Sequence, residues 1–164
     1  MVNEKQSSKQ AIDEFIADNL KEFLKSHGFA KRGRTWTKRH GSIVYIVNIQ
    51  ADRWNVINSV PSFFVNYGIY TPLVSSNGNP SKDITRLNNL TIGECLICER
   101  VTRRMNDTWK VYIEGRRLGL GRRHDVAGKM LTNAIEKQCL TLFDSLTTTE
   151  DIKQYLQVNG WRYQ

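Results

Sequence analysis

The strongest constraint on the fold of this chain is a change of hydrophobic period along its length. Near both ends, apolar residues recur every three or four positions, as on one face of an α-helix, whereas between them they follow the two-residue period of β-strands. A run of strands bracketed by helices predicts an α+β fold, because alternating βαβ units would place a helix after every strand. We therefore expect an N-terminal helix, an antiparallel sheet of about five strands, and two C-terminal helices packed on one sheet face.

The expected elements have the following bounds. The first helix covers residues 8–27, with Gly28 in the left-handed position after it. The expected strands are 35–37, 42–50, 62–70, 94–102 and 108–114. A long helix follows over residues 126–146, and Thr147 with Glu150 forms a capping-box pattern that opens a last helix ending near Gly160. The length suits a single domain, residues 1–164, with residues 1–7 as a disordered tail.

Positive charge is concentrated in two stretches of the chain. Of a formal net charge of +8, residues 31–53 contribute six Lys and Arg against one Asp, and residues 100–129 contribute nine against three acidic residues. If the two stretches meet in the fold, they form one basic surface that attracts phosphate or acidic protein. The residues expected to form this surface are Lys31, Arg32, Arg34, Lys38, Arg39, Arg116, Arg117, Arg122 and Arg123.

A second candidate site is a polar cluster on one face of the expected sheet. Asn48 and Gln50 share one side of a strand, and Asn66 and Arg100 belong to two other strands. Amide groups need hydrogen-bond partners when they are covered, so such a cluster suits a binding site. The alternative is a hydrogen-bonded ladder exposed to water.

Three stretches of the sequence resemble one known family in their order and spacing. They are residues 28–36 running on to Asn48-Ile49-Gln50, residues 64–70, and residues 95–100 followed by Asp107-Thr108-Trp109. Together they resemble the bacterial domain of unknown function numbered 4304, over about residues 9–157. The resemblance implies a helix, an antiparallel sheet and C-terminal helices, and it implies no activity because none is established for the family. Lys110 stands where a second Trp is usual.

The cysteines and the apolar runs limit the classes of site and compartment. Cys95 and Cys98 have the spacing of a zinc or redox half-site, but side chains three apart in one strand point to opposite faces, so we expect no metal site. An odd total of three cysteines fits a reducing compartment better than a disulfide framework. Apolar runs are far shorter than the roughly 20 residues of a membrane span. We expect a cytoplasmic protein with no cofactor.

Catalytic and nucleotide-binding patterns are weak. Residues 115–125 carry four arginines and could hold a phosphate, but Gly119 and Gly121 lack the third glycine of a dinucleotide fingerprint. The three histidines are dispersed, and no catalytic residue is expected. Trp36, Trp54 and Tyr112 lie near the basic stretches, so a groove for nucleic acid is an alternative.

The sequence therefore favours a small non-enzymatic binding protein whose basic surface engages an anionic partner. For this partner, we favour an acidic protein surface, such as that of a toxin or effector, over DNA or RNA. An enzyme acting on a phosphate-bearing small molecule is the second alternative.

Overall fold

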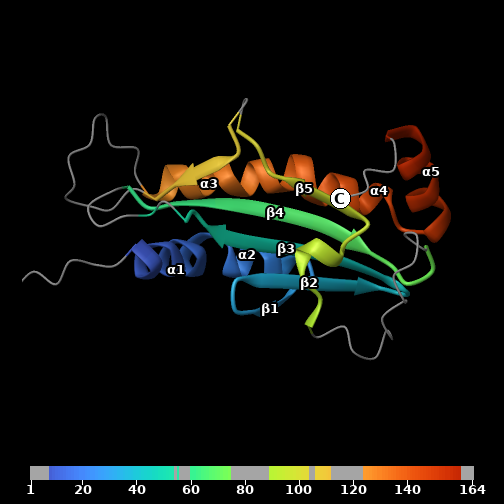
Figure 1. Ribbon diagram of the computed structural model, residues 1–164. Coiled ribbons are helices and arrows are strands. Elements are labelled where there is room, and N and C mark those ends of the chain that lie inside the picture. The colour runs from blue at the N-terminus through green and yellow to red at the C-terminus, as the bar shows by residue number, and fades with distance from the viewer. Residues whose placement is uncertain are drawn as a thin grey trace, which may run out of the picture.

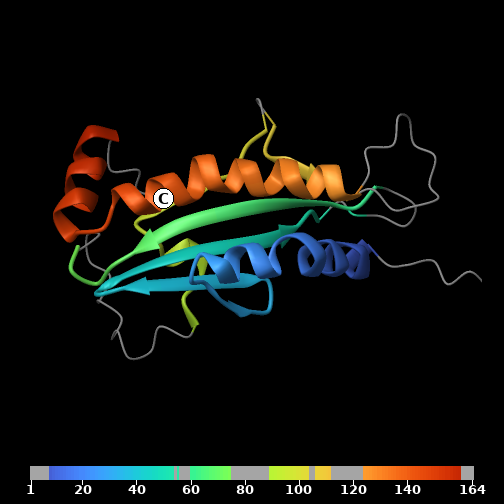
Figure 2. The same cartoon turned by 180° about the vertical axis from the view of Figure 1, so that it is seen from behind.

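The computed structural model describes residues 8–53, 55, 60–74, 89–103, 106–111 and 124–159. The described chain is an α+β fold in which the α-helices lie on one face of a twisted antiparallel sheet (Figure 1). Seen from behind, the N-terminal and C-terminal helices both lie in front of the strands (Figure 2). The predicted fold class is confirmed.

The sheet has six strands. They are β1 (Ala30–Arg32), β2 (Thr35–His40), β3 (Ile43–Ala51), β4 (Ser62–Tyr70), β5 (Ile97–Arg100) and β6 (Thr108–Lys110). The spatial order is β1-β2-β3-β4-β5, and β6 pairs with the other end of β4. Strand β4 has the predicted bounds, whereas β1 was not expected and β5 is shorter than the strand predicted over 94–102.

The N-terminal helical segment consists of α1 (Ser8–Asn19) and α2 (Lys21–Ser26), so the predicted helix is present with a break at Leu20. Its C-terminus is a Schellman motif in which the Phe29 N–H donates to the Leu24 carbonyl and the Gly28 N–H donates to the Lys25 carbonyl. The motif requires a left-handed residue, and Gly28 has φ +85°. The predicted role of this glycine is confirmed.

The C-terminal helices begin with one long helical run. It comprises α3 (His124–Ile135), a π-helical turn η3 (Glu136–Leu140) and α4 (Thr141–Ser145), close to the predicted 126–146. The last helix is α5 (Thr149–Asn159). Its cap lies one residue later than predicted: the Thr148 hydroxyl accepts from the Asp151 N–H at 3.1 Å, and the Asp151 carboxylate accepts from the Thr148 N–H at 2.9 Å.

The main core lies between the helices and the sheet. Side chains of α1, α2, α3, α4 and α5 pack there against alternate residues of β2, β3 and β4, among which Trp36 and Phe63 are fully buried. Phe143 of α4 stacks on Tyr45 with ring centroids 4.8 Å apart, and the Tyr45 hydroxyl donates to the Leu146 carbonyl at 3.0 Å. These contacts fix which face of the sheet is covered.

The opposite face, which we call the open face, is turned toward the viewer in Figure 1. One end of it is apolar and is covered by the short 3-10 helix η2 (Ile92–Glu94) and its neighbours, which pack on Val44, Ile46 and Tyr70. The other end carries Asn48, Gln50, Asn66 and Arg100, over which no described element lies. The open face is therefore where the predicted polar cluster has to be sought.

Candidate functional site on the open sheet face

A single line of paired residues crosses the whole sheet on the open face. Arg32 of β1 pairs with Thr35 of β2, Thr35 with Asn48 of β3, Asn48 with Asn66 of β4, and Asn66 with Arg100 of β5. We call these five residues the transverse row. It has an arginine at each end and neutral polar side chains between them.

Hydrogen bonds join four members of the row and Gln50 into one network. Arg100 Nε donates to Asn66 Oδ1 at 3.1 Å, Asn66 Nδ2 donates to Gln50 Oε1 at 3.2 Å and to Asn48 Oδ1 at 3.4 Å, and Asn48 Nδ2 donates to Thr35 Oγ1 at 2.9 Å. The structure thus brings together all four residues of the predicted polar cluster. It adds Thr35 and Arg32, which are identified only by the strand register.

The orientation of every amide in this network follows from Arg100. Because a guanidinium has no acceptor, the Asn66 oxygen must face it, and the Asn66 NH₂ group then faces the oxygens of Asn48 and Gln50. Asn66 itself is 5% exposed, so its amide has to be satisfied within the network. The donor direction therefore runs one way across the sheet, and the oxygens of Asn48 and Gln50 are turned inward.

Arg100 is held by two further contacts. Its guanidinium lies over the ring of Phe64 at 4.3 Å from the centroid, and Nη1 donates to Asp107 Oδ2 at 2.6 Å. Arg100 and Asp107 stand on either side of the isolated bridge between Arg103 and Asn106, so the ion pair joins the two ends of this hairpin. The sequence pattern did not identify Asp107 as a site residue, since its pairing depends on the hairpin.

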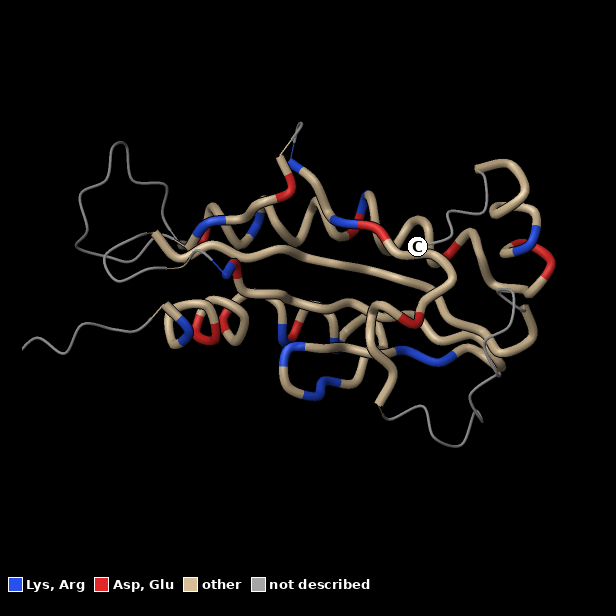
Figure 3. Tube along the Cα trace, viewed as in Figure 1, with Lys and Arg blue, Asp and Glu red and all other residues tan. Residues whose placement is uncertain are grey.

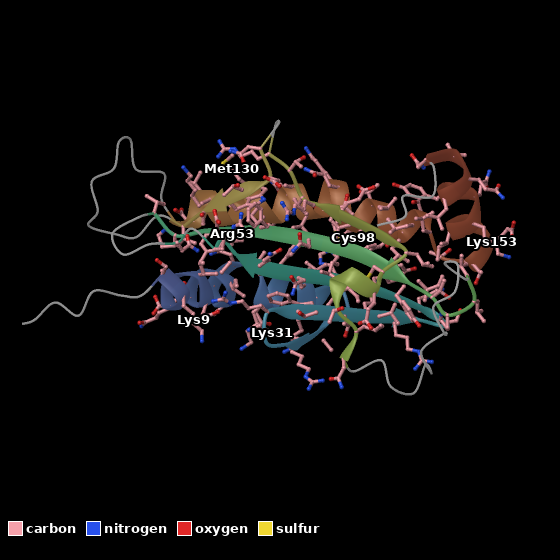
Figure 4. All side chains as sticks on the ribbon, in the orientation of Figure 1. Lys9, Lys31, Arg53, Cys98, Met130 and Lys153 are labelled. Atoms are coloured by element: carbon pink, nitrogen blue, oxygen red, sulfur yellow. The ribbon has the colours of Figure 1, made fainter. Side chains whose placement is uncertain are left out.

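The charges of the described strands lie at the two edges of the sheet. Strands β3 and β4 carry no charged residue, whereas Lys and Arg occur on β1 and β2 at one edge and on β5 and β6 at the other (Figure 3). The two edges can be found in Figure 4 by the labels of Lys31, which belongs to β1, and Cys98, which belongs to β5. The open face is therefore an uncharged, donor-rich centre between two basic margins.

The basic hairpin of β1 and β2 does not present all its cations on one face. Lys31 lies opposite Trp36 on the helix-covered side, with Nζ 5.5 Å from the Trp36 ring centroid. Lys38 lies on the same side, with Nζ 5.8 Å from the Phe29 ring centroid. Only Arg32 and Arg39 alternate onto the open face. The cations of this hairpin are therefore divided between two faces, because successive strand residues face opposite ways. The basic surface expected from both stretches stays a prediction.

Arg34 is engaged by an acidic side chain. Its Nε donates to Asp13 Oδ1 on α1 at 2.7 Å, and this hydrogen bond is the main cause that lowers the pKa of Asp13 below its usual value. The other predicted basic residues, Arg116, Arg117, Arg122 and Arg123, lie outside the described residues, as do Trp54 and Tyr112. Trp36, which the nucleic-acid alternative used as a stacking group, is fully buried in the main core.

The expectation that Cys95 and Cys98 point to opposite faces of one strand is wrong. Cys95 precedes β5 instead of lying in it, and its Sγ would be 2.7 Å from a Cβ placed on Gly68. Cys98 pairs with Gly68, so both thiols lie on the open face. Burial raises the pKa of each thiol. Among the described residues, no group of three or more His, Cys, Asp or Glu could hold a metal ion.

A carboxylate on the helix-covered side of β5 was also missed by the sequence pattern. Glu99 accepts from the Tyr67 hydroxyl at 2.9 Å and from the Tyr155 hydroxyl of α5 at 3.0 Å. Burial, followed by this hydrogen bond, raises the pKa of Tyr67. The contact ties α5 to the sheet edge, and no periodic signal relates residues 99 and 155.

Comparison with known proteins identifies the family. A family model described as "Domain of unknown function (DUF4304)" matches residues 20–144. The chain belongs to this family. The match is shorter than the 9–157 expected from the sequence motifs, but it includes every described strand and the whole transverse row.

No curated protein and no solved structure matches the DUF4304 chain. Within its described parts, no helix has the length and apolar character needed to cross a membrane. Membership of DUF4304 assigns no activity, so a function has to be inferred from the open face.

Proposed function

We propose that this DUF4304 protein is a non-enzymatic cytoplasmic binding module whose open sheet face engages an acidic protein surface. The observation that carries the proposal is the one-way hydrogen-bond network of the transverse row. It turns the oxygens of Asn48 and Gln50 toward Asn66, and of their amide N–H groups the network uses only the one that Asn48 donates to Thr35. A surface that offers donors and arginines complements carboxylates and carbonyl oxygens.

The carboxylates near this face are bonded within the fold, which supports a face that attracts negative groups. Asp107 is held by Arg100, and Asp52 accepts from the Ser62 hydroxyl at 3.0 Å. Glu94 accepts from the N–H and the hydroxyl of Thr91 within the capping box of η2. Each of these negative groups is thus engaged within the fold. The side chains of Arg39 and Lys110 are exposed at the margins.

An acidic protein fits this face better than nucleic acid does. Proteins that bind single strands stack bases on exposed aromatic rings. On the described open face, the ring of Phe64 is covered by the Arg100 guanidinium and Tyr70 is 8% exposed. On the described part of the open face, neither Phe64 nor Tyr70 therefore presents a free ring face to a base.

The test compares three probes on the purified full chain. Polyglutamate, a single-stranded oligonucleotide of equal charge, and polylysine are titrated by fluorescence anisotropy at low and moderate salt. We expect saturable binding of polyglutamate that survives moderate salt, weaker and steeply salt-dependent binding of the oligonucleotide, and no binding of polylysine. Tighter binding of the oligonucleotide at moderate salt would favour the nucleic-acid alternative.

Replacing Arg116, Arg117, Arg122 and Arg123 together by Ala tests whether the predicted basic loop belongs to the same surface. Weaker polyglutamate binding would include the loop in the interface. Unchanged binding would restrict the interface to the strands.

A further inference from the structure

A β-bulge at the start of β5 brings the side chains of Cys95 and Cys98 to the same face of the sheet. The Leu96 N–H donates to the Ile69 carbonyl at 2.9 Å, and Ile97 is the register partner of that same residue. Two residues of one strand therefore lie opposite one residue of the other, which defines a bulge. Leu96 and Ile97 both pack in the main core, whereas Cys95 packs in the apolar cluster of the open face. The alternation that would have separated the two thiols is thus interrupted.

Gly68 of β4 leaves room for the sulfur of Cys95 beside Cys98. Cys98 is the cross-strand partner of Gly68, and side chains at such directly opposite positions have Cβ atoms about 4.5–5.5 Å apart. A Cβ added to Gly68 would lie 2.7 Å from Cys95 Sγ and 2.8 Å from Cys95 Cβ. Cys95 therefore fills the place of the missing side chain of residue 68, which makes it the neighbour of Cys98 on the open face.

The two thiols differ in their access to solvent. Cys98 is exposed, whereas Cys95 is partly buried and its Sγ donates to the Thr91 carbonyl at 3.9 Å. Burial raises the pKa of both thiols, and at Cys98 the charge of Arg100 opposes this shift. A reagent in solution therefore meets the Cys98 thiol first, with Cys95 beside it as the second thiol.

Two neighbouring thiols suit a disulfide better than a metal site. A structural zinc site takes four ligands, and no group of three or more His, Cys, Asp or Glu gathers within the part of the chain that the structure describes. A disulfide needs only two sulfurs, on side chains whose Cβ atoms come within about 3.5–4.5 Å of each other. Both cysteines are free thiols in the structure, so the pair is in its reduced form.

We propose that Cys95 and Cys98 are a redox site that closes to a reversible disulfide, with a small-molecule disulfide such as oxidised glutathione as the oxidant. The Cys98 thiolate attacks one sulfur of the oxidant, whose S–S bond breaks and releases one thiol. The Cys95 thiolate then attacks Cys98 Sγ and releases the second small thiol. The two cysteines lose two electrons, the oxidant gains them, and the two cysteine protons end on the two released thiols. This inference does not depend on the proposed function.

The experiment incubates the folded, reduced full chain with mixtures of oxidised and reduced glutathione, blocks the remaining thiols with N-ethylmaleimide and digests the protein with trypsin. Both cysteines fall in one tryptic peptide, residues 87–100, whose mass distinguishes a disulfide, a bound glutathione and two blocked thiols. We expect the disulfide to exceed the glutathione adduct by about tenfold or more, because the second attack takes place within one molecule. Excess dithiothreitol should restore both thiols. If glutathione stays on Cys98, or if both thiols stay free, the inference is wrong.

Single variants test the order of attack. Cys95→Ser should accumulate glutathione on Cys98, because no second thiol is there to displace it, whereas Cys98→Ser should leave the partly buried Cys95 largely unmodified. If the two variants take up glutathione alike, the assigned order is wrong.

Cys139 is the internal control for unfolding. It is buried in η3, so its thiol should stay unmodified while the protein is folded and should react only after urea is added. If the disulfide forms no faster than Cys139 is modified, the pair reacts in the unfolded chain, and the redox site of the folded protein is excluded.

Discussion

The indole Nε1 of Trp109 donates a hydrogen bond of 3.0 Å to the carbonyl oxygen of Val101. This bond links β6 to the residue that follows β5, and both side chains are buried. Trp36 provides the contrast: its Nε1 is buried and finds no hydrogen-bond partner among the described residues. The two indoles thus belong to the same core, but only the N–H of Trp109 has a hydrogen-bond partner among the described residues.

This difference predicts unequal costs for one substitution. Trp109→Phe removes a hydrogen bond and leaves the Val101 carbonyl unpaired, whereas Trp36→Phe removes an N–H that is already unsatisfied. We expect Trp109→Phe to lower the free energy of unfolding by about 1–2 kcal/mol more than Trp36→Phe does. Urea denaturation followed by far-UV circular dichroism measures both. Equal losses would show that lost ring volume, not hydrogen bonding, dominates.

A second prediction concerns the π-helical turn. Gln138 lies in η3 and pairs with both backbone groups of Thr102: its Nε2 donates to the Thr102 carbonyl at 2.7 Å, and its Oε1 accepts from the Thr102 N–H at 2.9 Å. The side chain thereby occupies part of the β5 edge, where an unpaired edge would invite another strand. Gln138→Ala should cost about 1 kcal/mol of stability and increase aggregation on heating.

The measurements for Gln138→Ala are urea denaturation and light scattering during a thermal ramp. Lys137→Ala is the matched control, since Lys137 is an exposed neighbour in the same turn and should change stability by less than about 0.5 kcal/mol. If both variants aggregate alike, Gln138 does not protect the edge.

The sequence predicts the architecture well because periodicity reports which residues face a core. The period of two over residues 62–70 placed β4 correctly, and Gly28 marked the end of the first helix. The π-helical turn has no signal in the hydrophobic period, and the bonds from its Gln138 to Thr102 join positions that are distant in the sequence. Strand β1 was missed since three residues are too few to show alternation.

The sequence predicted which polar residues of the candidate site share a face, but not how they are arranged across the sheet. Asn48, Gln50 and Asn66 could be placed on one face from their own strands, but the row that joins them to Arg32 depends on the register of four strand pairs. The basic surface stays a prediction for a related reason: charge counted along the chain does not say which face of a strand each residue occupies. Arg34, for example, turns to Asp13.

A third prediction tests the close packing beneath η2. A Cβ on Gly68 would lie 2.7 Å from Cys95 Sγ and 2.7 Å from the Ile97 carbonyl oxygen, and the second of these is backbone that cannot turn aside. Gly68→Ala should therefore lower stability by about 1–3 kcal/mol. At Gly93 an added Cβ meets nothing within 4 Å, which makes Gly93→Ala the matched control. Similar thermal unfolding midpoints for the two variants would contradict this account of Gly68.

The last prediction follows from the ion pair between Asp13 and Arg34. Because the pKa of Asp13 is lowered in the folded protein, the unfolded chain takes up a proton first as the pH falls. The stabilisation is therefore present in full above the ordinary Asp pKa of 3.8 and is lost as the pH falls through the lower, folded-state value. Both side chains are partly exposed, so we expect a coupling of a few tenths of a kcal/mol at pH 7. A double-mutant cycle of Asp13→Asn and Arg34→Gln, measured by urea denaturation at pH 7 and again in acid below the ordinary Asp pKa, should give a coupling that decreases as the pH falls. A coupling that stays the same until the protein unfolds in acid would exclude the Asp13 carboxylate as its source.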